Sequence, residues 1–287
     1  MDKFFQKTPY KRFVEFTSLQ TDRYALLCLI LDECSLPHQM LEIKGKRHIA
    51  VPGWPAQKRK ANMTILTAHY DRTAGSPGAN DNTAAVFQLI ETAYRLTDNE
   101  ISLQQLPVLF VFTDGEELSE GESLYLQGSY NLGLYIKESG LRNCPIFSFD
   151  ACGTGDTLII STAADQLIKN EIAAGAETTR RKVRNLRRKA LEAARNVRLE
   201  KVQLLPTPFS EDAGFLLAGI AAQTITVLPS SEAALVRREL PYTGNTANKR
   251  LIPETWRILN GPGDSLVRLT PEYWKKITAF MEALSQL

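Results

Sequence analysis

The chain has 287 residues, of which 44% are hydrophobic and 23% charged, so it is long enough to bury a sizeable core. Its formal net charge of +2 gives no global attraction to nucleic acid or to an acidic membrane surface, and we expect neither as a partner. Tyr24–Leu31, the longest apolar stretch near the amino terminus, is too short to span a bilayer, and no signal peptide is recognisable, so we expect a cytoplasmic protein with reduced cysteines.

Helices and strands are predicted from the spacing of apolar side chains. Residues 10–34 have helical spacing, with Cys28 on the side that faces the core. The continuously apolar run PVLFVF at Pro107–Phe112 is typical of a strand covered on both faces. The other predicted elements are, in chain order, strands at Arg47–Val51 and Met63–Ala68, a helix at Thr83–Leu96, a loop and helix at Gly121–Lys137, strands at Pro145–Phe149, Leu158–Ile160 and Gln223–Val227, and a helix at Pro271–Leu284.

This alternation of strands and helices predicts an α/β fold with a largely parallel sheet. No Gly/Ser-rich linker divides the chain and no internal repeat is found, so we expect residues 1–287 to form a single domain. Residues 1–60 carry no motif that indicates a function, and we interpret them as a helical lead-in to that domain.

The segment from Thr178 to Lys201 contains ten Lys or Arg residues and two Glu residues. Its apolar residues keep a three–four spacing, so we interpret residues 178–202 as an inserted basic amphipathic helix. A solvated basic face, with the apolar stripe packed on the body, is the favoured interpretation. Binding of nucleic acid or another acidic partner is less favoured because no aromatic residue lies among the charges. A lid or an oligomer contact also stays open.

Acidic residues or a histidine follow three of the predicted strands, at the ends where parallel α/β sheets bind ligands. If the strands are neighbours, these side chains converge on one edge of the sheet, and the Gly- and Pro-rich loop after Asp71 can bring Asp81 back to it. The residues that follow the strands are His69 and Asp71, then Asp114, Glu116 and Glu117, and then Asp150.

Converging carboxylates repel one another and are costly to desolvate, and a cation is the usual remedy. A neutral imidazole with several carboxylates suits zinc, manganese or cobalt better than calcium. Taken singly, His69 could be structural, Asp81 could cap the following helix, and Glu116 and Glu117 could be ordinary loop charges. Together and in this order, they predict a metal site.

Four short motifs occur in order along the chain: His69-x-Asp71, Gly78-Ala-Asn-Asp81-Asn, Asp114-Gly-Glu116-Glu117 and Phe149-Asp150. In combination they closely resemble the co-catalytic zinc exopeptidases of metallopeptidase family twenty-eight, which includes leucyl-type aminopeptidases, glutamate carboxypeptidases and glutaminyl cyclases. The resemblance covers roughly residues 60–287. It implies a three-layer α/β/α sandwich around a mixed, largely parallel central sheet, the phosphorylase/hydrolase-like zinc exopeptidase fold.

The resemblance also implies roles for individual residues. His69, Asp81 and Asp150 would hold one metal ion, and Asp81 would bridge to a second ion that Glu117 also holds. Glu116 would be the general base. Asp71 would orient His69, in keeping with the rule that a ligating imidazole usually donates its other N–H to a carboxylate or carbonyl.

The chain departs from the family pattern at its last motif. The family's fifth ligand is a histidine in an "HTPxDT" sequence, and the corresponding stretch here is Leu259-Asn260-Gly-Pro-Gly-Asp264-Ser265. Asn260 could offer its amide oxygen, which is a weaker ligand than imidazole. The other histidines, His38 and His48, precede the motifs and are interpreted as surface or loop residues. The cofactor is therefore expected to be one or two Zn²⁺ ions, with other divalent ions possible.

We therefore expect a metal-dependent exopeptidase, an aminopeptidase that hydrolyses a peptide or small amide. A catalytically impaired binding module and a glutaminyl cyclase-like enzyme stay open as alternatives. The loss of the histidine at Asn260 disfavours the cyclase, because the family's cyclases hold their single zinc with that histidine. Glu211, Asp212 and Tyr242 are candidates for substrate binding, and an oligomer is not excluded.

Overall fold

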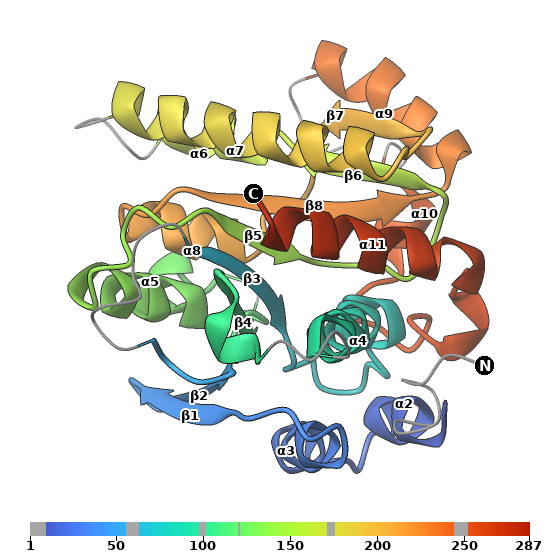
Figure 1. Ribbon diagram of the computed structural model, residues 1–287. Helices are drawn as coiled ribbons and strands as arrows, with labels where there is room; N and C mark the ends of the chain where they lie inside the picture. Colours follow the sequence, from blue (N-terminus) through green and yellow to red (C-terminus); the bar gives the residue numbers. More distant parts are fainter. Residues whose placement is uncertain (1–9, 56–62, 98–101, 120, 171–175, 244–251) are drawn as a thin grey trace.

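The computed structural model describes residues 10–55, 63–97, 102–119, 121–170, 176–243 and 252–287. In these ranges, eight strands form one sheet in the order β1-β2-β4-β3-β5-β8-β6-β7, with helices on both of its faces (Figure 1). This arrangement confirms the predicted three-layer α/β/α sandwich around a mixed sheet.

The four central strands β4, β3, β5 and β8 run parallel to one another, as their apolar sequences predict. Antiparallel pairs lie on either side of them, where β2 meets β4 and β6 meets β8. The strand bounds are β1 Gln39–Ile43, β2 Lys46–Val51, β3 Thr64–His69, β4 Val108–Thr113, β5 Ile146–Phe149, β6 Thr157–Ser161, β7 Val202–Leu205 and β8 Ala222–Leu228.

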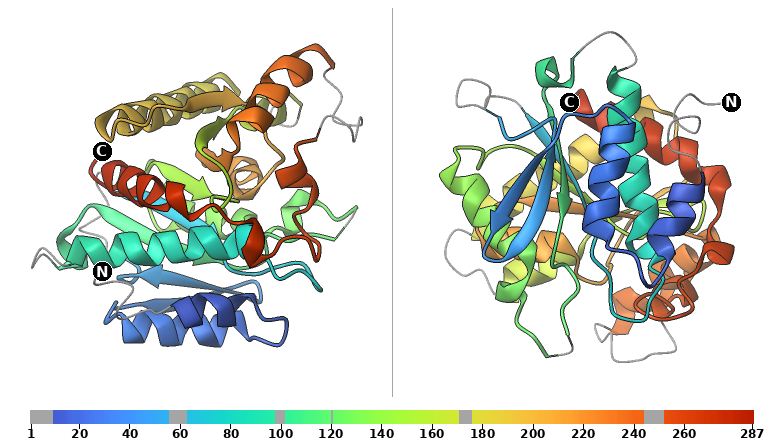
Figure 2. Two further views of the ribbon diagram at one scale, coloured as in Figure 1. Left: turned by 90° about the vertical axis from the view of Figure 1, so that its right-hand side faces the viewer. Right: turned by 90° about the horizontal axis from the view of Figure 1, so that it is seen from below.

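Helices cover the sheet in two layers. The long helices α4, α11 and α7 lie side by side on one face, with α2 and α3 next to α4, while α5 and α8 cover the other face (Figure 2). The helix bounds are α2 Tyr10–Thr17, α3 Arg23–Glu33, α4 Ala85–Thr97, α5 Gly128–Glu138, α6 Ala163–Asn170, α7 Ala176–Asn196, α8 Glu211–Leu217, α9 Ser230–Thr243, α10 Glu254–Arg257 and α11 Trp274–Ser285. Among the described residues, no helix is both long and apolar enough to cross a membrane.

The amino-terminal region differs from the prediction in two ways. Residues 10–34 form two helices instead of one, because the Asp22 side chain accepts the backbone N–H of Ala25 at 3.1 Å and starts α3 as an N-cap. The interpretation of residues 1–60 as a helical lead-in is also incomplete. Strands β1 and β2 form a hairpin that pairs with β4, so this region extends the central sheet.

The basic segment is a helix that packs on the body, as the favoured interpretation predicts. Its apolar residues Val183, Leu186, Ala190 and Ala193 are buried, and α7 lies against α11. The helix ends at Asn196, before the predicted limit of 202, because Arg198 has a left-handed φ of 55° that a helix cannot continue through, and Val202 begins β7.

The parallel strands bring the predicted site residues to one edge of the sheet. His69 is the last residue of β3 and pairs in register with Thr113, the last residue of β4. Phe149 ends the neighbouring β5, so Asp150 follows at the same edge. The segments after three adjacent strands therefore leave the sheet together, as ligand sites in α/β folds require.

Arg23 of α3 fixes the loop that follows β3. Its side chain is 5% exposed, and it donates hydrogen bonds to the carbonyl oxygens of Phe16, Tyr70, Asp71, Pro77 and Gly78 and to Thr83 Oγ1, at 2.8 to 3.2 Å. Gly78 has a φ of 57°, and a Cβ there would lie 2.7 Å from Arg23 Nη2. The loop therefore needs glycine at this position, both for its backbone conformation and to admit the guanidinium.

Replacing Arg23 with methionine should destabilise the protein, because it leaves several buried carbonyl oxygens without donors. We expect Arg23→Met to lower the free energy of unfolding by about 3 kcal/mol or more. Arg268→Met is the matched control, since Arg268 forms an exposed ion pair with Glu254 and its loss should cost less than about 1 kcal/mol. Chemical denaturation of both variants measures the difference, and equal losses would contradict a special role for Arg23.

Candidate metal centre

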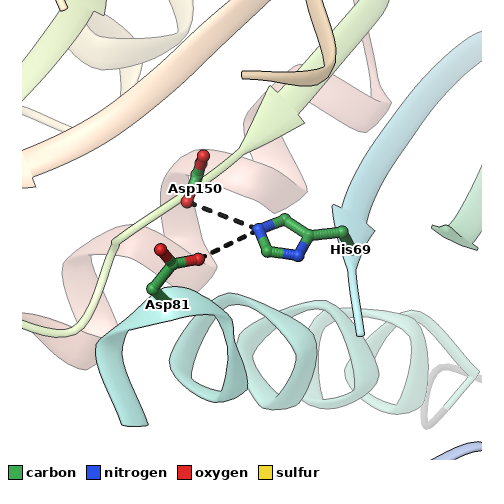
Figure 3. A group of neighbouring side chains, drawn as sticks. All are labelled: His69, Asp81 and Asp150. Atoms are coloured by element: carbon green, nitrogen blue, oxygen red, sulfur yellow. Dashed lines mark ion pairs between the residues drawn. The ribbon is translucent and has the colours of Figure 1, made fainter. Parts of the chain in front are cut away.

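A buried histidine lies at the centre of the site. His69 is 0% exposed, and its Nε2 atom is 3.1 Å from Asp81 Oδ1 and 3.7 Å from Asp150 Oδ1 (Figure 3). Its other ring nitrogen, Nδ1, is 3.5 Å from Asp71 Oδ1. The structure therefore brings together four predicted residues, which come from the ends of β3 and β5 and from the segment before α4.

Backbone contacts hold the two carboxylates that face His69. Asp81 lies in a short helical turn, η2 (Ala79–Ala84), whose backbone N–H groups at Asn80 and Asp81 donate to the Asp264 carboxylate at 2.8 and 2.9 Å. Asp150 follows β5, and its N–H donates to Ile225 O at 3.0 Å. The N-cap of η2 is Gly78, so the Asp81 side chain is directed to His69 and does not cap the helix.

The three residues have the chemistry of a cation site. His69 Nε2, Asp81 Oδ1 and Asp150 Oδ1 are buried and have no hydrogen-bond partner, although both carboxylate oxygens lie within ion-pair distance of the imidazole nitrogen. Their candidate ligand atoms all lie within 4.8 Å of one another. Unpartnered buried polar atoms are costly, and an imidazole with two carboxylates is a ligand set that suits zinc and similar divalent ions. The residues therefore fit such an ion.

The pKa shifts reflect the same crowding of negative charge. Burial, with repulsion from Asp150, raises the pKa of Asp81 to about 6. Burial would lower the pKa of His69, but its carboxylate neighbours, with Asp150 first, outweigh this effect and raise it well above its usual value. A bound cation would relieve both effects, because it stabilises the ionised carboxylates directly.

The two glutamates after β4 lie beside this group. Asp71 accepts the backbone N–H groups of Glu116 and Glu117 at 3.2 and 3.0 Å, so the residue that faces His69 Nδ1 also anchors the β4 loop. Gln127 Nε2 donates to Glu116 Oε1 at 3.1 Å. Candidate ligand atoms of His69, Glu116 and Glu117 lie within 4.8 Å of one another. Burial raises the pKa of Glu116 well above its usual value, as suits a proton acceptor.

Asn260 also reaches the site, as its place in the sequence predicts. It has a φ of 62° and lies against Glu117 and Thr73 at an exposed rim. Thr73 Oγ1 donates to Glu117 Oε2 at 2.9 Å. The last expected ligand position is therefore next to Glu117, and it carries the amide of Asn260 as the sequence predicts.

Two of the three candidates for substrate binding are buried in the structure. Glu211 and Asp212 are each 1% exposed, because α8 places them under the sheet edge, where Thr67 and Thr113 donate to the Glu211 carboxylate. Neither side chain therefore faces solvent. Tyr242 lies in the last turn of α9, and its side chain is outside the described residues.

Several residues that hold the site escaped sequence analysis. These residues act through side-chain hydrogen bonds to segments far away in the sequence, and no periodic pattern marks such contacts; they are Arg23, Thr73, Gln127 and Asp264. Asp264 is the residue that the sequence could most easily have indicated, because it lies in the same short motif as Asn260. His48 was interpreted as a surface or loop residue, and this was wrong, since it is 0% exposed in β2 and accepts the N–H of Asp114.

Comparison with known proteins identifies relatives of this chain. The sequence model of Peptidase family M28 matches residues 51–220. A Schizosaccharomyces pombe protein that carries the name endoplasmic reticulum metallopeptidase 1 is 29% identical over 114 residues, which cover 38% of this chain and 12% of the relative.

Solved structures share the fold at low sequence identity. BSAP, a zinc aminopeptidase from Bacillus subtilis, superposes with a TM-score of 0.54 and 20% identity, covering 83% of this chain and 49% of that one. The glutaminyl cyclase of Porphyromonas gingivalis gives a TM-score of 0.63 at 13% identity, covering 97% of this chain and 95% of that one. The chain therefore spans about half the length of the aminopeptidase and nearly all of the cyclase.

Metal removal tests the His69 group directly. Zinc added to chelator-treated protein should raise the free energy of unfolding, by about 4 kcal/mol when free zinc is 1,000-fold above its Kd, because the ion binds only the folded site. Asp150→Asn should abolish most of this gain, whereas Asp165→Asn, at a surface carboxylate that pairs with Arg187, should keep it. Thermal or chemical unfolding with and without zinc measures the gain, and an unchanged response in Asp150→Asn would exclude this site.

Proposed function

The chain belongs to peptidase family M28, and from this membership we propose that it is a metal-dependent exopeptidase that acts as an aminopeptidase. The observation that carries the proposal is the buried group of His69, Asp81 and Asp150, whose facing polar atoms lack partners, with Glu116 next to it. A divalent ion in this group and a carboxylate beside it are together the minimum for hydrolysis of an amide by activated water.

In this proposal, His69, Asp81 and Asp150 would hold the ion, which as a Lewis acid would make water more acidic and polarise the scissile carbonyl. Glu116 accepts the proton of the attacking water and returns it to the leaving amine. Gln127 holds the Glu116 carboxylate through the 3.1 Å hydrogen bond, so the base keeps one orientation during both transfers.

Asp71 has a positioning role in the same proposal. Its Oδ1 atom lies 3.5 Å from His69 Nδ1, which favours the tautomer that leaves Nε2 able to bind an ion. The same carboxylate accepts the N–H groups of Glu116 and Glu117. A single side chain thus couples the orientation of the ligand to the placement of the base.

A glutaminyl cyclase is the second candidate. The similarity to the Porphyromonas gingivalis enzyme favours it, because the two chains have nearly the same extent. Against it stands Asn260, at the position where the family's cyclases have a zinc-binding histidine. A binding module without catalysis is disfavoured by the retained Glu116, since a protein that only binds has no need of a base at that position.

If Glu116 is the general base, replacing its carboxylate by an amide of the same shape should strongly lower the catalytic rate. Glu116→Gln keeps the shape and the hydrogen bond to Gln127 but removes the proton acceptor, so kcat should fall by about 10²–10⁴-fold while zinc binding is retained. Hydrolysis of aminoacyl anilides and metal content measure the two effects. Glu122→Gln is the control, since Glu122 is exposed and caps its own loop. Wild-type activity in Glu116→Gln would remove Glu116 from the mechanism.

The two enzymatic candidates differ in what they release. With a peptide that begins with glutamine, an aminopeptidase liberates the free amino acid, whereas a cyclase liberates ammonia and leaves the peptide bonds intact. We expect the zinc-loaded protein to release amino acids from unblocked peptides and to spare the same peptides when the amino terminus is acetylated. Ammonia release without amino-acid release would support the cyclase instead.

A further inference from the structure

At the rim of the site, the Glu117 carboxylate is engaged by hydrogen-bond donors. With the Asn260 amide nitrogen toward Glu117, it donates to Oε1 and Oε2 at 2.7 Å each and lies 2.7 Å from Thr73 Oγ1. Thr73 Oγ1 in turn donates to Glu117 Oε2 at 2.9 Å. The opposite amide orientation would set an oxygen against two carboxylate oxygens, so the network favours the nitrogen. In the opposite orientation, Thr73 Oγ1 would instead donate to Asn260 Oδ1 at 2.7 Å. With the amide nitrogen toward Glu117, both oxygens of this carboxylate have donors from the protein itself.

The turn that carries Asn260 is held in place. Ser76 Oγ donates to Gly261 O at 3.1 Å, and Asp264 N donates to Gly261 O at the same distance. The Asp264 carboxylate accepts two N–H groups of η2, so the turn is tied to the segment that carries Asp81. The φ of 62° at Asn260 is a conformation that Asn, Asp and His adopt more readily than most residues. The amide is therefore directed at Glu117 by the fold.

We propose that this chain, acting as the hydrolase proposed above, binds a single divalent ion at His69, Asp81 and Asp150. Hydrogen bonds from Asn260 and Thr73 to Glu117 take the place of a second ion. The active site is thus a one-ion variant, in which a neutral amide substitutes for an imidazole ligand and its metal.

The ligand chemistry supports this assignment. A second ion beside Glu117 would have Asp81 and Glu117 as its anionic ligands, and His69 Nε2 already faces the first position. An amide oxygen is a poor ligand for zinc compared with imidazole, so this position lacks the donor that would secure the ion. The ion would also displace the donors that Glu117 already has, and this cost lowers its affinity further.

Metal stoichiometry tests the inference without recourse to activity. Titration of chelator-treated wild type with zinc, followed by calorimetry and by metal analysis after dialysis, should give about one tightly bound ion per chain. Asn260→His should restore an imidazole beside Glu117 and give about two ions per chain. With cobalt in place of zinc, the variant should also show the magnetic coupling of two neighbouring ions, which the wild type should lack.

Two further variants keep the test decisive. Asn260→Asp supplies an anionic ligand at the same φ and should also add a second site if Asn260→His folds poorly. Asn143→His is the control for a new surface imidazole, because Asn143 is exposed and precedes β5, at the opposite end of that strand from Asp150. It should leave the stoichiometry of the wild type unchanged.

The outcomes separate this inference from the proposed function. Two tightly bound ions in the wild type would overturn the one-ion assignment and leave the hydrolase proposal standing. A second ion absent from both folded Asn260 variants would also overturn it, since the amide would then not be what excludes the ion. A wild type that binds no ion would refute the hydrolase proposal itself.

Discussion

Like-charged carboxylates crowded around one buried imidazole are the constraint on which the rest of this structure depends. Asp71, Asp81 and Asp150 all approach His69, and burial with repulsion among the acids raises the pKa of Asp81 to about 6 and that of Glu117 to about 8. Such a group is unfavourable in a folded interior unless cations or hydrogen-bond donors offset the repulsion. The carboxylates are crowded because three parallel strands end at one edge of the sheet. Hydrogen bonds within the loops that follow these strands offset the repulsion.

The contacts that offset this repulsion and fix the loops are largely hydrogen bonds between charged side chains and backbone groups. Asp71 accepts two N–H groups from the β4 loop, and Asp264 accepts two from η2. Arg23 is instead a donor, and its buried guanidinium donates to carbonyl oxygens of the loop after β3. Burial lowers the pKa of Arg23 to about 9. Each loop is thus fixed by a charged side chain from another element. The ligands can keep their places whether or not an ion is bound, which is the preorganisation that metal catalysis requires.

The sequence predicted the parts of the molecule that repeat a pattern. The apolar runs of β3, β4 and β5 and the acids that follow them led to both the layer structure and the residues around His69. The short strands β1 and β7 were missed, because β1 buries only Leu41 and β7 only Leu205. The burial of Glu211 was not predicted, because its partners Thr67 and Thr113 lie far from it in the sequence. Contacts between segments far apart in the chain leave no local signature.

The pair of hydrogen bonds from η2 to the Asp264 carboxylate has a consequence for biosynthesis. Its two hydrogen bonds join residues that are 184 and 183 positions apart in the chain. A nascent polypeptide that has not yet exposed residue 264 outside the ribosome lacks the acceptor for both N–H groups, even when every strand of the sheet has emerged. The segment that carries Asp81 therefore lacks these two native hydrogen bonds until residue 264 has emerged.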